Sequence, residues 1–117
     1  MPQIDQDKSY QFMWGKTPKF TSFSTGGSGD NNVVLGTTGK QILVVAYSMS
    51  STATQSVKWK SGGTDLTGTM AITASVTSTQ ESAEGLFITD DPDNLILNVG
   101  TATAVTGSVT YYELDAS

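Results

Sequence analysis

The residues with the clearest chemical potential are the acidic cluster Asp90, Asp91 and Asp93, with Asn94 beside them. Oxygen ligands of this kind bind hard cations such as calcium. The segment lacks the central glycine and the distal bidentate glutamate of an EF-hand loop. A solvated turn also accounts for every residue, because Asp and Asn favour turn positions and Pro92 presets φ. We interpret the cluster as a turn, and ion binding by the three aspartates stays open.

Paired carboxylates are the second chemistry to consider, because two of them can cleave a glycosidic bond. The candidates are Glu81, Glu84, Glu113 and the eight aspartates, and no spacing among them selects a pair. The run Gly26-Gly27-Ser28-Gly29 has the glycines of a phosphate-binding loop, but no Lys-Ser/Thr ending follows it. We interpret that run as a flexible linker.

Several residue types that most enzymes use are absent from the chain. It contains no Cys and no His, and all six of its basic residues are Lys. Thiolate and Ser-His-Asp nucleophiles are therefore excluded, as are zinc sites built on Cys or His and the two-point arginine grip on phosphate. We expect a protein that is not an enzyme and that holds no cofactor or metal.

Aromatic side chains are the remaining candidates for a functional surface. Tyr10, Phe12 and Trp14 recur at every second position, which places their rings on one face of an extended segment. They belong either to a core strand or to an arm that binds a partner, and we favour the arm because their neighbours are polar and Gly-rich. The candidate partner-binding residues are Tyr10, Phe12, Trp14, Phe20, Phe23 and Tyr112.

Tyr112 is included because it follows Tyr111 directly. Adjacent residues of a strand point to opposite faces, so one of the two rings must lie on an outer face or in a subunit contact. Trp59 alternates with Lys58 and Lys60, which predicts a tryptophan in the core and lysines at the surface.

The composition favours short strands joined by turns. Thr, Ser and Gly together occupy 44 of the 117 positions, and these residues are poor helix formers. We predict an all-β protein with an N-terminal arm and Gly-rich linker at residues 1–32, and a body at residues 33–117. About eight strands in that body predict a compact two-sheet sandwich of the jelly-roll type. So small a body buries limited surface, which favours oligomerisation.

The net charge of −5 argues against nucleic acid as a partner. The longest apolar run, residues 42–47, is too short to cross a membrane, so no membrane partner is expected. The first residues are acidic and lack the apolar core of a signal peptide. We therefore expect synthesis in a cytoplasm.

Residues 39–114 resemble small β-structured virion proteins of tailed bacteriophages, namely head decoration (cement) proteins and related accessory modules. The resemblance rests on the segments GKQILVVAYSMS, VKWKSGGTDLTGTM, GLFIT and NLILNVGTATAVTGSVTYYEL. It covers about two thirds of the chain and leaves out residues 1–32.

The resemblance implies a structural protein, commonly a trimer, that binds the major capsid protein on the outer capsid surface and stabilises the head. It assigns a function to no individual residue. An alternative is a carbohydrate- or receptor-binding module of a phage tail or fibre, with Tyr112 as a platform for a host glycan. A small glycosidase or lyase is a third, weaker hypothesis.

Overall fold

A computed structural model describes residues 16–116, which form ten β-strands. In chain order the strands are β1 (Lys19–Ser24), β2 (Gly29–Val34), β3 (Lys40–Ser51), β4 (Gln55–Ser61), β5 (Thr64–Asp65), β6 (Met70–Ile72), β7 (Ser78–Glu81), β8 (Phe87–Ile88), β9 (Leu95–Val99) and β10 (Val105–Asp115). Across this described range, no helix has the length and apolar character of a transmembrane span.

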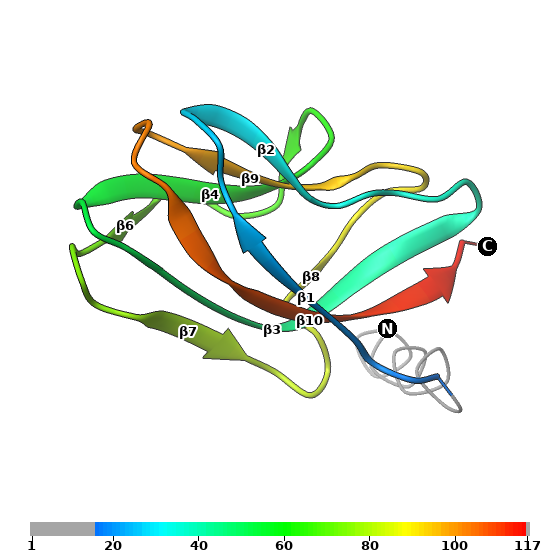
Figure 1. Cartoon of the computed structure of the whole chain (residues 1–117). Helices are drawn as coiled ribbons and strands as arrows, with labels where there is room; N and C mark the ends of the chain where they lie inside the picture. The colour runs from blue at the N-terminus through cyan, green and yellow to red at the C-terminus, as the bar shows by residue number, and fades with distance from the viewer. Residues whose placement is uncertain (1–15, 117) are drawn as a thin grey trace.

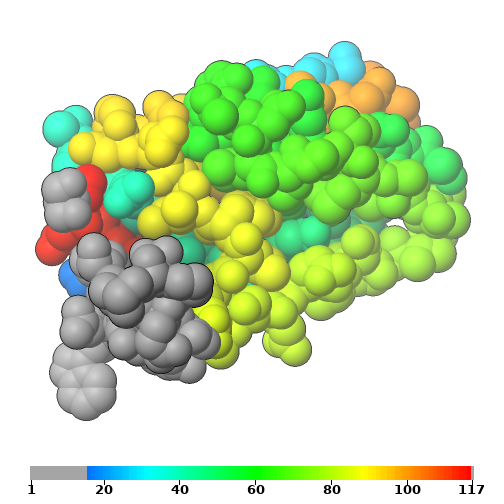
Figure 2. Space-filling model, turned by 180° about the vertical axis from the view of Figure 1, so that it is seen from behind, coloured from blue at the N-terminus to red at the C-terminus, as the bar shows by residue number. Residues whose placement is uncertain are grey.

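The strands form two antiparallel sheets that face each other (Figure 1). Sheet A has the order β1-β10-β3-β7, and β8 also pairs with β3. Sheet B has the order β2-β9-β4-β5, and β6 also pairs with β4. The chain passes repeatedly from one sheet to the other, and the resulting strand order is that of a jelly roll. The prediction of an all-β, two-sheet sandwich is confirmed. Seen from behind, the chain between β4 and β9 forms much of the surface (Figure 2).

β3 contains a bulge that explains its unusual sequence, which is apolar at every position from 42 to 47. Its register with β10 shifts between Thr110 and Tyr111, so that Val45 of β3 is an extra residue. An extra residue exchanges the inward and outward sides of all positions that follow it. Val44 before the bulge and Tyr47 after it therefore both point into the core.

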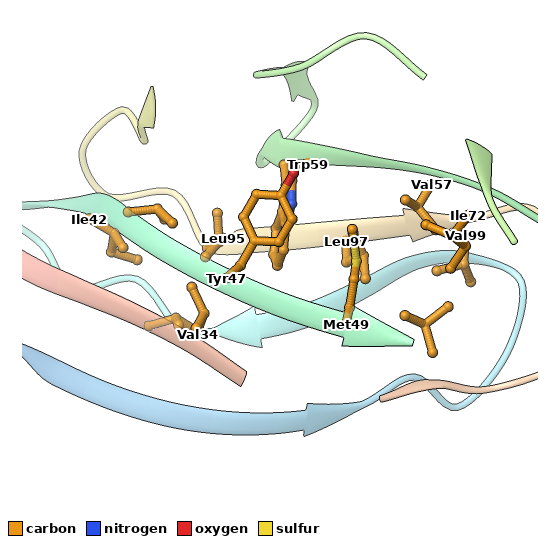
Figure 3. Packing of buried hydrophobic residues seen from close by; sticks show 13 residues of the cluster. Val34, Ile42, Tyr47, Met49, Val57, Trp59, Ile72, Leu95, Leu97 and Val99 are labelled. Atoms are coloured by element: carbon orange, nitrogen blue, oxygen red, sulfur yellow. The ribbon is translucent and has the colours of Figure 1, made fainter. Parts of the chain in front are cut away.

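The core fills the space between the sheets, and Figure 3 shows its packing. Every second residue of β9 and of the first part of β10 points into it, as the alternation of a strand requires. The buried cluster consists of Val34, Ile42, Val44, Tyr47, Met49, Val57, Trp59, Ile72, Leu95, Leu97, Val99, Val105 and Val109.

Trp59 is the largest side chain of this core and is fully buried, as its alternation with lysines predicts. Its ring lies 5.3 Å from that of Tyr47 and 5.9 Å from those of Phe23 and Phe87, centroid to centroid. Among the described residues, its indole Nε1 meets no acceptor in full hydrogen-bond geometry, and its weaker polar contact is with the side chain of Tyr47. Burial raises the pKa of Tyr47 above its usual value, and the Tyr47 hydroxyl donates to the sulfur of Met70 at 3.6 Å.

The predicted boundary between an arm and a body does not match the described structure. Residues 19–24 form β1, which pairs with β10, and residues 29–34 form β2, which pairs with β9. Thr25, at the end of β1, is buried, and its hydroxyl accepts the backbone N–H of Val105 at 2.9 Å. These residues are therefore parts of the sandwich. Residues 1–15 of the predicted arm lie outside the described range.

The Gly-rich run between β1 and β2 is a turn fixed by side-chain hydrogen bonds, and the prediction of a flexible linker is wrong. The Asn31 side chain accepts the N–H of Gly26 at 3.0 Å and donates to the carbonyls of Gly27 and Gly29 at 2.9 and 3.1 Å. Gly29 has a φ of +89°, which an L residue adopts only with strain. The glycines thus serve backbone geometry, and one asparagine side chain closes the turn.

Candidate functional site

The outer face of sheet A is the strongest candidate for a functional surface. Cross-strand pairing places its outward side chains in three rows across β1, β10, β3 and β7. The rows are Ser24-Thr106-Ser50, Ser22-Ser108-Ser48-Thr79 and Phe20-Thr110-Ala46-Glu81. We call the first two the hydroxyl rows, because every side chain in them carries a hydroxyl group. Only the third row contains a charged residue, Glu81.

An open hollow of about 560 Å³ lies beside the third row. The bulge of β3 presents two successive side chains, Val45 and Ala46, to this hollow. Its wall is the loop after β7, where the N–H of Ser82 donates to the carbonyl of Val45 at 2.8 Å. The lining residues are Val45, Ala46, Glu81, Ser82, Ala83 and Thr110.

Apolar side chains continue on this face beyond the hollow. Leu43 pairs with Tyr112 on one side and with Ile88 on the other, and all three point away from the core. Phe20 is 73% exposed and Ile88 is 38% exposed. Together these four residues and the hollow form the apolar end of sheet A. A second hollow, of about 290 Å³, borders the first hydroxyl row and is lined by Ser50, Ser51, Thr52, Ser75, Thr77, Ala104 and Thr106.

The structure separates the predicted partner-binding residues. Phe20 and Tyr112 lie on the outer face of sheet A, whereas Phe23 packs edge-on against Trp59. Phe23 is therefore occupied by packing within the subunit. Tyr10, Phe12 and Trp14 lie outside the described residues, and their role stays a prediction. The sequence did not predict that Val45, Ala46 and Ala83 line a surface hollow. The one indication was that β3 is apolar on both of its faces.

The adjacent tyrosines divide as their spacing predicts. Tyr111 packs against the core, so Tyr112 points outward. The pKa of Tyr111 is raised, mainly by burial and to a smaller extent by the neighbouring carboxylate of Glu113. Glu113 forms an ion pair with Lys19 of the edge strand β1, and this contact raises the pKa of Lys19.

The charges of the described chain gather away from the hydroxyl rows. Each of the five lysines in residues 16–116 lies within 4 Å of a carboxylate. On the outer face of sheet B, Lys60 meets Asp30 at 3.1 Å and Lys58 meets Asp65 at 3.2 Å. Lys16 and Lys40 both contact Asp115, and Lys40 is the main cause that lowers the pKa of this carboxyl group.

The acidic cluster acts as a structural turn between sheet B and the β2–β3 loop. Asp91 accepts the backbone N–H of Gly39 at 2.7 Å, and Asp93 accepts the hydroxyl of Ser61 at 2.9 Å. Asn94 accepts the N–H of Gly36 at 2.7 Å. Within the described residues, no group of three or more carboxylates is arranged to hold a metal ion. These bonds favour the interpretation of the segment as a turn.

Replacing Asn94 by alanine is expected to destabilise the protein by about 1–2 kcal/mol, because the Gly36 N–H loses its acceptor in a tight site. Gly36 has no room to adjust: a Cβ on it would lie 2.0 Å from the carbonyl oxygen of Pro92. Urea denaturation measures the loss. Asn32→Ala is the control, because Asn32 makes only a 3.3 Å side-chain contact with Asn94, and a change below about 0.5 kcal/mol is expected. Equal effects of the two substitutions would contradict the structural role of Asn94.

Acid sensitivity is expected from Asp30, whose pKa is lowered by hydrogen bonds from Asn98 and Lys60. A carboxyl group with a lowered folded-state pKa stabilises the fold above its unfolded value of about 4, and that stability is lost as pH falls through the folded value. The free energy of unfolding in urea should therefore fall below about pH 4, and Asp30→Asn should flatten this fall by about 0.5 kcal/mol or less. An unchanged acid profile in Asp30→Asn would exclude the contribution.

Comparison with known proteins supports the fold and names no family. No protein-family model matches the chain, and no curated protein matches it. The chain is similar to one in a solved structure of Bacillus endospore appendages, which are described as a novel family of disulfide-linked pili. The likeness has a TM-score of 0.51 at 10% identity and covers 86% of this chain and 88% of the other. A likeness at this identity is one of fold.

Proposed function

We propose that this protein is a non-enzymatic structural subunit that binds the outer surface of a phage capsid and stabilises the head. The observation that carries the proposal is the outer face of sheet A, whose three rows hold one charged side chain in a chain of net charge −5. A face with so few charges lets acidic subunits pack closely, because few like charges come into contact. The resemblance to head decoration proteins supplies the partner, the major capsid protein, and the expected trimer.

The chemistry of this face favours binding through several weak contacts from an oligomer over one strong contact from a single subunit. Hydroxyl groups form hydrogen bonds that exchange with water at little net gain, so each subunit should bind modestly. A trimer at a symmetry axis combines three such contacts, and the apparent affinity rises without any new type of interaction.

The test is binding of the purified protein to capsids that lack it, from the phage whose genome encodes it. We expect Ser108→Lys, in the middle of the second hydroxyl row, to lower occupancy at least tenfold, because a lysine would be buried without a partner. Asn98→Lys, on the outer face of sheet B, is the control and should bind as the parent does. Immunogold labelling of intact virions should mark the head. Equal binding of both variants, or label confined to the tail, would overturn the proposal.

A second candidate is a glycan-binding module, and the exposed ring of Phe20 favours it. Phe20 lies beside Thr110 at the end of rows that are rich in hydroxyl groups, so a sugar ring could stack on it. Phe20→Ala should then abolish binding on a glycan array, whereas Tyr112→Ala should have a smaller effect because Tyr112 is half-buried. An array with no bound glycan would exclude this candidate.

The likeness to an appendage subunit favours a third arrangement, a fibre of this chain alone. The chain has no cysteine, so disulfide links between subunits are excluded. Electron microscopy of the concentrated protein would reveal filaments if this arrangement holds, and their absence would leave the capsid proposal in place.

A further inference from the structure

The edge of sheet A at β1 carries backbone groups that no described strand pairs. β1 is the end strand in the order β1-β10-β3-β7, so β10 lies on one side of it and no described strand lies on the other. The N–H of Thr25 donates to the carbonyl of Val105 at 3.0 Å, which makes these two residues a hydrogen-bonded pair of the ladder. Every second residue of a strand bonds to the same neighbour, and the residues between them direct their N–H and C=O groups to the other side. The residues of β1 with outward backbone groups are Phe20, Ser22 and Ser24.

Among the strands of residues 16–116, the other edge strands are protected against pairing with a further strand, and β1 is not. Short length, bulges and charged side chains are the usual means of protection. β5, β6, β7 and β8 have only two to four residues each, and β2 has a bulge at Val33 and a carboxylate at Asp30. β1 has six residues, a regular register with β10 and one charge, Lys19, at its first position. It is therefore a template for another strand.

Phe20 gives a second, independent sign of a partner at this edge. Its side chain is 73% exposed, the largest value among the big apolar side chains of the described chain. It lies on the outer face of sheet A, at a position whose backbone groups also point outward. A strand added at β1 covers this ring and satisfies the free backbone groups at the same time.

We infer that β1 pairs antiparallel with β1 of a second copy of this chain, about a two-fold axis at Ser22. Ser22 then lies opposite Ser22 of the partner subunit, and Phe20 lies opposite Ser24 of the partner subunit. This register gives every outward backbone group of β1 a partner, and it places each large ring opposite a small side chain. A two-fold contact requires self-complementarity of this kind.

The charge of β1 favours the antiparallel pairing. Lys19 is the one charge of the strand, and in the antiparallel register the two lysines lie about 20 Å apart along the strands. Parallel pairing in register would bring them to within about 5 Å of each other. Because a two-fold contact closes on two copies, it yields dimers and no filament. It can also join neighbouring trimers, so the inference goes beyond the proposed function and does not depend on it.

Disulfide formation tests the inference, because the chain has no cysteine of its own. In the inferred register the Cα atoms of the two Ser22 residues lie about 5.5 Å apart, within the range that a disulfide bridges. Those of the two Ser24 residues lie about 14 Å apart, beyond that range. The whole chain is oxidised as Ser22→Cys and, for the control, as Ser24→Cys, at high protein concentration because a contact of one strand pair is weak. Both positions are exposed, and we expect the covalent dimer to form at least about tenfold faster for Ser22→Cys.

A proline in β1 tests the backbone pairing separately. Ser24→Pro removes an N–H that points away from β10, so the ladder between β1 and β10 keeps its bonds. Added to Ser22→Cys, it should slow formation of the dimer about tenfold, whereas Ser24→Ala keeps the N–H and should change the rate less than about twofold. Equal rates for Ser22→Cys and Ser24→Cys, or no effect of Ser24→Pro on a chain with the parent's circular dichroism spectrum, would overturn the inference. The comparison of the two cysteine variants decides even if Ser24→Pro unfolds the chain, because both leave the backbone of β1 unchanged.

Discussion

Gly107→Ala is expected to leave little folded protein. Gly107 lies in the middle of β10 and pairs with Met49 of β3. A Cβ at this position would lie 2.0 Å from the carbonyl oxygen of Ser48 and 2.8 Å from the Cα of Met49. Both are backbone atoms of the central strand, so no side-chain rotation relieves the overlap. The expected loss exceeds about 3 kcal/mol, against a total stability of about 5–15 kcal/mol for a domain.

The measurement is the urea midpoint together with the yield of soluble protein. Gly63→Ala is the matched control, because a Cβ on Gly63 meets no atom within 4 Å. We expect the control to unfold within about 1 kcal/mol of the parent. If Gly107→Ala unfolds at the same urea concentration as Gly63→Ala, the close approach of β10 to β3 is wrong.

Trp59→Ala is the second substitution with a large expected effect, a loss of about 3–5 kcal/mol. Trp59 is fully buried and contacts the rings of Phe23, Tyr47 and Phe87. Its removal leaves a cavity between the two sheets and takes away the packing contact that three other aromatic rings make with it. Free energies of unfolding in urea give the size of the loss.

Trp59→Phe separates packing from polar contributions at this site. It keeps an aromatic ring and removes the indole Nε1, which among the described residues has no acceptor in full hydrogen-bond geometry and only a weaker polar contact with Tyr47. A buried donor without a partner costs stability, so its loss offsets part of the lost volume. We expect Trp59→Phe to cost less than half as much as Trp59→Ala. Similar losses in both variants would show that Nε1 has an acceptor.

Local patterns in the sequence predicted the parts of the fold that depend on alternation. The positions of Trp59, Tyr111 and Tyr112 relative to the core follow from period two alone, as do the inward residues of β9. The turn at residues 90–94 follows from its composition. In these places a side chain's environment depends on its neighbours in the chain.

The features that the sequence did not predict depend on contacts between residues far apart in the chain. Residues 19–34 contain many polar and Gly residues, which predicted an arm, yet β10 and β9 supply their backbone pairs 61 to 92 positions later. The bulge at Val45 is likewise defined by its register with β10. The hollow needs both that bulge and the loop after β7, so residue types alone could not indicate it.

The pairing of β1 with β10 also determines when this chain can fold. The first and the last described strands are neighbours in sheet A, and β10 is also the partner of the central strand β3. Sheet A therefore lacks its second strand until the ribosome has made the C-terminal residues, and its closure joins positions far apart in sequence, which slows folding. Until then β3 is a long apolar strand with an unpaired edge, a form prone to aggregation.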